Sequence, residues 1–531
     1  IRGPGSVLYG TNAFSGVVNI FTKKPEDLKG FSYSVFSGPN GTTASSVYGD
    51  RKENLGYKIS GSYHQLSSYD DRTADALESL SANAYIDYQI SKDFSFSLAG
   101  GANKTAAAKI FSLVGPVSPD ATQTYVKLNG QWQGLKGQFY WSYINLDAGF
   151  NFPIPQKIVS DPLWFDPKYQ GMDREDWLVW REQNILQLSV DAPESQNIHS
   201  VGHTADLEIS YEHEFAEIDR IYAGGDLRVV TLDSPDLVDT STQTNNYSLF
   251  LQNDLYPWEW FLFNAGVRWD MLSVDESGSE DIHNIAPRGA LIFFPHKDHA
   301  LRLSGGAAFR NPAYFESNMK MRLADMSTTA ETSKLDSALT IPDVTRDADL
   351  LFEGNSDLST EKIYTAEFGY SGRFINRVEV NVDFFYNIVR DLILFNGDPE
   401  KMYWALNPFS PEDWLDDKRN NPFNFNNDVN ASAMGFEVAA RYRATSWLKL
   451  FVNYSFEKVW VDNKDELINK YVKDKNDFYQ RLPQKAYFDV GGAQIANTMF
   501  DTDPGEIFSI SKDDVSLEDV TTVHKETPMH K

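Results

Sequence analysis

Apolar and polar residues alternate with a period of two along many segments of this chain. The clearest example lies between residues 376 and 387, where polar residues separate Val378, Val380, Val382, Phe384 and Tyr386. Segments 82–90 and 447–457 repeat the pattern. Successive side chains of a β-strand point to opposite faces, so each segment predicts a strand with one apolar face. The pattern fits a transmembrane barrel with lipid outside and a wet lumen, and equally a soluble sandwich with its apolar faces inward.

The lengths of the links between the strands separate these two architectures. From Gly30 onward, short links are expected at 51–54, 91–93, 133–135, 215–218, Pro257, 295–299, 373–375 and 445–446. Long links are expected at 67–81, 104–121, 147–200, 233–244, 273–285, 310–360, 389–433 and 458–484, and only the first link of this series, 39–42, is short. Every second link of an up-and-down barrel lies on the same rim, which produces such alternation, whereas a Greek-key sandwich gives no reason for it. The chain is therefore predicted to be all-β, a transmembrane antiparallel up-and-down β-barrel with about 18 strands.

Composition narrows the functional classes. The 531 residues include no cysteine, so disulfides and thiolate metal sites are excluded. The formal charge of −27 disfavours nucleic acid as a partner, because binding to phosphates requires a basic surface. Aromatic residues make up 14% of the chain, which suits an aromatic girdle or an aromatic binding surface.

The first 24 residues form a distinctive stretch. Gly3-Pro4-Gly5 predicts a turn, Ser6 an N-cap and Gly10 the end of a short helical turn. Residues 17–22 are β-branched and apolar, which predicts a buried strand. The stretch resembles the end of the plug domain of TonB-dependent outer-membrane receptors, of the siderophore and cobalamin type. The matching positions include Arg2, Gly3, Pro4, Ser6, Leu8, Tyr9, Gly10, Gly16 and Asn19.

Three further segments resemble the same family. Residues 308–316 are similar to its F-R-x-P-x-x-x-E strand end, and residues 358–370 to its L-x-P-E-K strand, with Thr360 in place of proline. Phe385-Tyr386 followed by Asp391-Leu392-Ile393 is similar to the segment that comes next in the family. By this resemblance, 1–25 is the end of a plug, 26–492 is an incomplete barrel and 493–531 is a polar tail, non-native in origin on this interpretation.

The two ends depart from the family pattern. Family barrels have about 22 strands and close on an aromatic residue, whereas the dyad pattern fades here after Gly492. The signal peptide, the TonB-contacting segment and most of the plug are not in this sequence. We therefore expect a fragment that does not transport by itself, since open sheet edges do not persist in hydrocarbon.

The resemblance implies energised uptake of a scarce nutrient, such as a ferric siderophore or cobalamin. The implied partners are outer-membrane lipid, TonB and a small-molecule ligand, expected to be a metal chelate. The implied location is the outer membrane of a Gram-negative bacterium. A passive porin or an adhesin-type barrel is the alternative, although neither has a plug. A secreted β-rich enzyme such as a glycosidase is a third hypothesis and would require a carboxylate pair in a cleft.

Neither a catalytic constellation nor a cofactor site is evident. His296 and His299 flank one turn, and His199 and His203 lie in a strand pattern, so no metal site is predicted. The longest links instead carry aromatic residues that suit capture of a flat or apolar-faced ligand. They include Trp164, Trp177, Trp180, Tyr403, Trp404 and Trp414. Packing of the loops, or a place in the girdle, explains such residues equally well.

Overall fold

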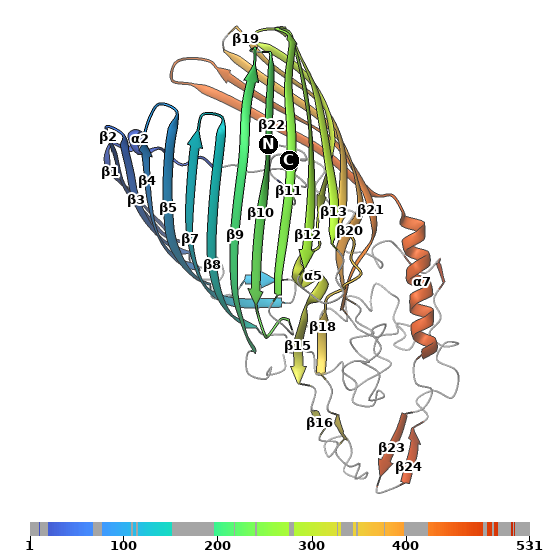
Figure 1. Cartoon of the computed structure of the whole chain (residues 1–531). Coiled ribbons are helices and arrows are strands. Elements are labelled where there is room, and N and C mark those ends of the chain that lie inside the picture. Colours follow the sequence, from blue (N-terminus) through green and yellow to red (C-terminus); the bar gives the residue numbers. More distant parts are fainter. Residues whose placement is uncertain are drawn as a thin grey trace.

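The structure is a computed structural model, and its architecture is a strongly curved antiparallel sheet (Figure 1). It describes residues 10, 20–66, 77–107, 110–112, 115–150, 196–216, 218–238, 242–274, 281–325, 328–330, 344–346, 349–375, 377–397, 423–481, 486–490, 493–497, 511–512 and 515. Most of the predicted plug motif and the six aromatic residues of the long links lie outside the described residues.

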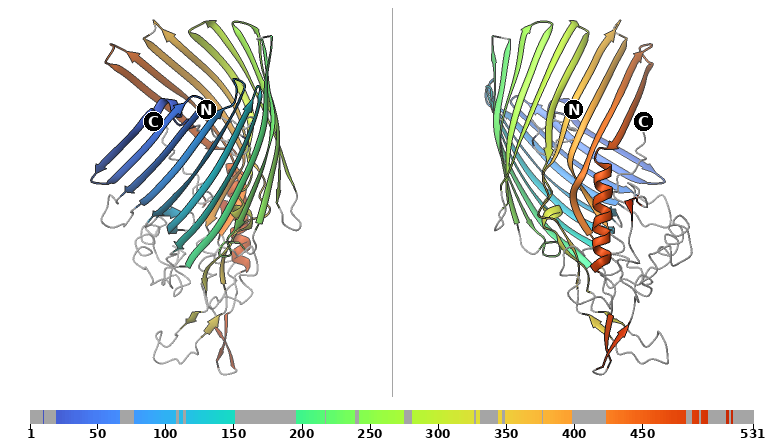
Figure 2. Two further views of the ribbon diagram at one scale, coloured as in Figure 1. Left: turned by 60° about the vertical axis from the view of Figure 1, so that its left-hand side comes forward. Right: turned by 90° about the vertical axis from the view of Figure 1, so that its right-hand side faces the viewer.

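One sheet of 18 strands forms the wall. In chain order its strands are β1 (Gly30–Gly38), β2 (Gly41–Lys52), β3 (Leu55–Leu66), β4 (Leu77–Gln89), β5 (Phe94–Ala107), β6 (Ile110–Ser112), β7 (Gly115–Trp132), β8 (Leu135–Phe150), β9 (Gln196–Phe215), β10 (Asp219–Asp233), β11 (Thr242–Trp258), β12 (Phe261–Val274), β13 (Ile282–His296), β14 (His299–Arg310), β19 (Glu361–Phe374), β20 (Val378–Gly397), β21 (Phe423–Arg443) and β22 (Lys449–Val461). Strand β6 continues the line of β5 along the same partner, β7. The remaining 17 strands pair antiparallel in sequence order, so the predicted up-and-down fold is confirmed. Figure 2 shows this wall curving around an interior.

The two faces of the wall differ in the way that the dyad pattern predicts. In β4, Leu80, Ile86 and Tyr88 are exposed on the outer face, while Asn83 and Asp87 are half-buried on the inner face. The exposed large hydrophobic residues of the neighbouring strands follow the same alternation. A soluble sandwich would bury these side chains between two sheets, whereas a membrane barrel presents them to lipid.

Exposed aromatic side chains gather at the rim that carries the short turns. Trp258 ends β11 and Trp260 lies in the β11–β12 turn, and their rings stack with centres 5.0 Å apart. Trp132 and Trp447, beside two other short turns, are 58% and 80% exposed. Aromatic girdles of this kind mark the level of a membrane interface.

Pro257 does not form the turn that its position predicts. β11 continues to Trp258, and the chain reverses at Glu259–Trp260 instead. The β11–β12 register shifts between Leu255 and Trp258. Because proline has no N–H for the ladder, it is accommodated here as an irregularity near the end of the strand.

Several of the predicted long links contain regular structure. The link 104–121 is largely a strand extension, because β6 and β7 pair from Ile110↔Val117 to Ser112↔Gly115. The link 458–484 contains helix α7 (Lys464–Arg481), which has acidic residues in its first turn and buries Leu467 and Ile468. Its apolar positions recur at helical rather than dyad spacing, a signal that the strand interpretation missed.

The remaining elements are small. Helix α2 (Pro25–Leu28) precedes β1 and packs on β2. The β14–β19 link carries α5 (Tyr314–Asn318), β15 (Lys320–Asp325), β16 (Thr328–Ala330), β17 (Val344–Arg346) and β18 (Asp349–Glu353). β23 (Ala486–Val490) and β24 (Ala493–Asn497) pair only with each other, so the described wall ends at β22. None of the described helices is long and apolar enough to cross a membrane. The division at residues 25 and 492 remains a prediction.

Candidate functional site

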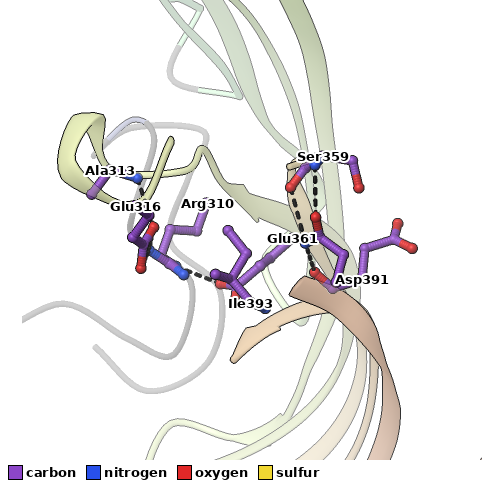
Figure 3. A network of polar contacts seen from close by, with 8 residues as sticks. Arg310, Ala313, Glu316, Ser359, Glu361, Asp391 and Ile393 are labelled. Carbon is purple, nitrogen blue, oxygen red and sulfur yellow. Dashed lines mark hydrogen bonds and ion pairs between the residues drawn. The ribbon is translucent and has the colours of Figure 1, made fainter. Parts of the chain in front are cut away.

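The segments that resemble the receptor family meet at one polar network at the long-link end of the wall. Arg310 ends β14, Glu316 lies in α5 and Glu361 begins β19. Arg310 Nε donates to Glu361 Oε2 at 2.5 Å, and Arg310 Nη1 donates to Glu316 Oε2 at 2.9 Å (Figure 3). One guanidinium therefore ties two carboxylates that lie 45 residues apart in the sequence.

The local sequence explains why Glu316 reaches this position. Pro312 stops the strand pattern shortly after Arg310, because proline cannot supply a ladder N–H. The chain then enters α5, where Glu316 accepts a 2.7 Å hydrogen bond from the backbone N–H of Ala313. A carboxylate in the first turn of a helix satisfies a backbone N–H that has no helical partner.

A bulge in β20 supplies a further donor to the network. The β19–β20 ladder ends at Lys362↔Arg390, and Asp391 follows with a φ of 57°. Beyond this point the N–H of Ile393 donates to Glu361 Oε1 at 2.6 Å. The carboxylate of Glu361 thus replaces the ladder partner that the bulge removes.

Two asparagine side chains, Asn427 and Asn311, form hydrogen bonds with the segments that surround the network. Asn427 donates to the carbonyl oxygens of both Ser359 and Asp391, and its own Oδ1 accepts the N–H of Ser359 at 2.7 Å. Asn311 accepts hydrogen bonds from Thr360 at 3.1 Å and from Asn284 at 2.9 Å. Thr360, which stands where the family usually has proline, therefore contributes a hydroxyl donor.

The network is buried, and it contains two carboxylates for one guanidinium. Glu361 and Glu316 are 3% and 9% exposed, and Arg310 is the guanidinium between them. Each carboxylate receives one charged donor and one backbone N–H, so neither is free to act as a general base. Among the described residues, no group of three or more potential ligands could hold a metal ion. The arrangement suits a rigid frame rather than chemistry.

The inner face of the wall between β3 and β8 is strongly hydrophilic. Hydroxyl and amide groups bond across the strands, as in Ser62···Ser81 at 2.7 Å and Tyr125→Asn83 at 3.0 Å. A cavity of about 580 Å³ lies near the short-turn rim, between α2 and the polar inner faces of several strands from β4 to β10. A polar interior and an apolar exterior are the expected arrangement for a barrel that conducts a hydrophilic solute.

Of the plug-motif residues named above, Gly10 is the one that the structure describes. It is buried, has a φ of 79° and lies against Arg268 on the inner face of β12. The prediction of a buried strand over residues 17–22 is wrong for its described residues, because residues 20–22 lie outside any strand and Ile20 and Phe21 are 80% and 87% exposed. The motif residues Arg2, Gly3, Pro4, Ser6, Leu8, Tyr9, Gly16 and Asn19, like the aromatic candidates Trp164, Trp177, Trp180, Tyr403, Trp404 and Trp414, lie outside the described residues, and their roles remain predictions. Sequence reasoning identified the segments of Arg310, Glu316 and Glu361 but did not foresee that they converge.

Comparisons with known proteins agree with this architecture. Residues 27–498 match the family model described as "TonB dependent receptor-like, beta-barrel". The chain is 22% identical over 542 residues to the vitamin B12 transporter BtuB of Vibrio vulnificus (strain CMCP6). The aligned region covers 97% of this chain and 72% of that protein.

Solved structures show the same fold. The siderophore receptor PirA from Pseudomonas aeruginosa has a TM-score of 0.59 and 16% identity, covering 87% of this chain and 72% of that one. The FrpB iron transporter from Neisseria meningitidis (F3-3 variant) has a TM-score of 0.57 and 14% identity, covering 87% and 67%. The chain therefore belongs to the TonB-dependent receptors, outer-membrane receptors and transporters of Gram-negative bacteria that are not enzymes.

Proposed function

We propose that this receptor imports a scarce nutrient, a ferric siderophore or cobalamin, and that TonB drives the uptake at the expense of the proton-motive force. The observation that carries the proposal is the position of Gly10, which is buried against the inner face of β12. A plug that includes Gly10 at this position would obstruct the lumen. A passive porin, the alternative function, requires an open lumen.

The identity of the ligand is proposed from the names of similar proteins. They are a vitamin B12 transporter, a siderophore receptor and an iron transporter. Vitamin B12, ferric siderophores and iron are all polar solutes that contain a metal. The inner face between β3 and β8 carries many hydroxyl and amide groups. These groups form weak hydrogen bonds with a polar solute and release it again, so the face supports passage of such a solute through the lumen.

The aromatic residues of the longest links are proposed to capture the ligand. Trp164, Trp177 and Trp180 belong to one link, and Tyr403, Trp404 and Trp414 to another. Replacing the three tryptophans of the first link with alanine should weaken binding, since truncation of central aromatic contacts commonly costs more than about 1 kcal/mol each. Unchanged affinity in a barrel that still folds would assign them to packing of the loops.

A growth experiment tests the substrate class. A strain that lacks the gene is grown with a hydroxamate or catecholate ferric siderophore as the only iron source, and separately with cyanocobalamin as the only cobalamin. The proposal expects a growth defect on one of these sources that the intact gene restores. Full growth of the deletion strain on all of them at limiting concentration would contradict the proposed substrates.

A further inference from the structure

Three successive short turns form a basic stretch of the short-turn rim. They are residues 296–299, 374–378 and 443–449, each counted with the strand residues that border it, and they contain four lysine or arginine residues and one aspartate. The other five short turns, counted in the same way, contain two basic and five acidic residues. In a chain with a formal charge of −27, these three turns are therefore a local basic patch.

Hydrogen bonds join the three turns to one another. The strands that they connect, β13, β14, β19, β20, β21 and β22, are consecutive neighbours in the sheet. The backbone N–H of Arg373 donates to the carbonyl oxygen of Asp298 at 2.8 Å, and that of Arg443 donates to the carbonyl oxygen of Arg377 at 2.8 Å. The basic patch is therefore one continuous surface rather than three separate tips.

A row of aromatic rings places this patch at the level of the membrane interface. Trp260, in the β11–β12 turn, meets Phe293 of β13 edge-on with ring centres 5.6 Å apart. The rings of His296 and His299 lie 5.9 Å apart, and His299 meets Phe374 edge-on at 5.0 Å. Phe293 and Phe374 are 40% and 42% exposed on the outer face. Since an aromatic girdle marks the interface, both imidazoles lie at the depth of the lipid headgroups.

Both imidazoles can donate a hydrogen bond to a partner outside the chain. Nδ1 of His296 accepts from the backbone N–H of Asp298 at 3.3 Å. The hydroxyl of Tyr370, on β19, lies 2.8 Å from Nδ1 of His299 and can donate to it. A neutral imidazole that accepts at Nδ1 keeps its proton on Nε2, so each ring has a donor left for an external acceptor.

The cations beside these rings are more exposed than the carboxylate of the patch. Lys297 and Arg377 are exposed, and neither forms an ion pair within the part of the chain that the structure describes. The side chain of Asp298, in contrast, is 29% exposed and lies 3.7 Å from His296. Accessible cations next to imidazole donors suit a phosphate group, which accepts charge-assisted hydrogen bonds.

We propose that this patch binds the phosphate of an anionic phospholipid, of the phosphatidylglycerol class, in the periplasmic leaflet of the outer membrane. The residues that would contact the headgroup are His296, Lys297, His299 and Arg377. The short turns of outer-membrane barrels face the periplasm, so this rim meets that leaflet. Basic residues at a membrane surface attract anionic lipids, and the patch supplies them where the rest of the rim is acidic.

The outer face farther from the turns fits the acyl chains of such a lipid. Leu303 of β14 and Phe368 of β19 lie opposite each other in the ladder and are 55% and 45% exposed. A phospholipid therefore meets cations and donors at its head and an apolar wall along its chains. An acidic polymer of the periplasm, such as peptidoglycan, would meet only the tips of the turns, so imidazoles at the level of the girdle favour the lipid.

Native mass spectrometry of the purified receptor tests this proposal without a transported ligand. The receptor in detergent is titrated with phosphatidylglycerol and, separately, with phosphatidylethanolamine that has the same acyl chains. A lysine or arginine at an anionic lipid surface strengthens binding about five-fold, so K297Q/R377Q should lower the affinity for phosphatidylglycerol at least about five-fold. The affinity for phosphatidylethanolamine, which has no net charge, should change little. H299F keeps a ring against Phe374 but removes the donor, and it should weaken the binding of both lipids, because both contain a phosphate.

A matched variant on the acidic part of the rim separates the patch from a general loss of charge. Lys52 and Lys92 are exposed beside the β2–β3 and β4–β5 turns. K52Q/K92Q removes the same two charges and should bind phosphatidylglycerol as the unmodified receptor does. Heat-modifiable migration on gels confirms that each variant has a folded barrel.

Three results would overturn the proposal. The first is equal affinity of the unmodified receptor for the two lipids, and the second is an equal loss of phosphatidylglycerol binding in both double variants. The third is binding of inorganic phosphate, or cosedimentation with peptidoglycan, that K297Q/R377Q abolishes while lipid binding is unchanged. That result would assign the patch to a free ion or to the cell wall.

Discussion

The backbone N–H of Ile393 and the carboxylate of Glu361 form a 2.6 Å hydrogen bond between neighbouring strands at the point where their ladder has ended. The same carboxylate accepts from Arg310. Glu361 therefore joins β14, β19 and β20 at the long-link end of the wall, and the bulge at Asp391 is stabilised by a side chain rather than by the ladder.

Removal of Glu361 should destabilise the barrel. The E361A substitution removes one carboxylate partner of Arg310 and leaves the backbone N–H of Ile393 unpaired. Disruption of a buried ion pair costs about 3–5 kcal/mol. E379A is the control, because Glu379 pairs with Arg373 and Arg441 at an exposed position of the same sheet, where loss of a pair costs about 0–1 kcal/mol. Equal losses in the free energy of unfolding, measured with urea in lipid vesicles, would contradict the role given to Glu361.

Two substitutions on β11 test whether the apolar face of the wall points outward. Leu249, near the middle of β11, is 62% exposed on the outer face, whereas Gln252 lies on the inner face beside Asp254. L249R should cost about 2–4 kcal/mol if this face meets the bilayer midplane. Q252R should be tolerated, because it adds a cation to a wet lumen next to a carboxylate. A larger loss of stability for Q252R than for L249R would reverse the assignment of the faces.

The orientation of the two rims can be tested by labelling. The chain has no cysteine, so a single introduced thiol gives no background. P235C lies in the β10–β11 link and S446C in the β21–β22 turn, and both positions are exposed. A membrane-impermeant maleimide should label P235C on intact cells and S446C only after the outer membrane is permeabilised. Labelling of S446C on intact cells would show that the short turns face outward.

A pH dependence is expected where α2 meets the wall. The pKa of Glu26 is lowered, mainly by a hydrogen bond from its own backbone N–H and to a smaller extent by the ion pair with Arg51, whose Nε lies 3.0 Å from Glu26 Oε2. A carboxylate with a lowered pKa in the folded state stabilises the protein above its ordinary pKa, and this contribution disappears as the pH falls through the lower value. The melting temperature of the wild type should therefore exceed that of E26Q at neutral pH and converge with it in acid. A difference that stays constant across this range would exclude the effect.

The strands were predictable because their signal is local. Alternating faces in 376–387 and 447–457 predict β20 and β22 without any knowledge of their neighbours. The short turns were predictable for the same reason, except at Pro257, where a residue that usually marks a turn lies in a strand irregularity. Helix α7 was not predicted, because its apolar residues recur with the 3.6-residue period only within a segment that was expected to be an irregular link.

The sites were harder to predict because they depend on register between distant strands. Glu361, Arg310 and Ile393 belong to separate segments whose resemblance to the family says nothing of their hydrogen bonds. The basic patch carried no sequence signal, because a lysine or arginine in a turn is common on any surface. Its continuity emerges only when β14 pairs with β19 and brings the turn of Lys297 beside the turn of Arg377.

Uptake of a radiolabelled nutrient with and without TonB tests the central claim most directly. Cells that express the receptor are given the ferric siderophore or cyanocobalamin on which growth of the deletion strain depends on the restored gene, at a concentration far below that needed for diffusion. Accumulation should stop when the gene for TonB is deleted or when an uncoupler collapses the proton-motive force, although binding to the cell surface persists. Accumulation that continues at the same rate in both conditions would contradict energised import and would favour a passive pore.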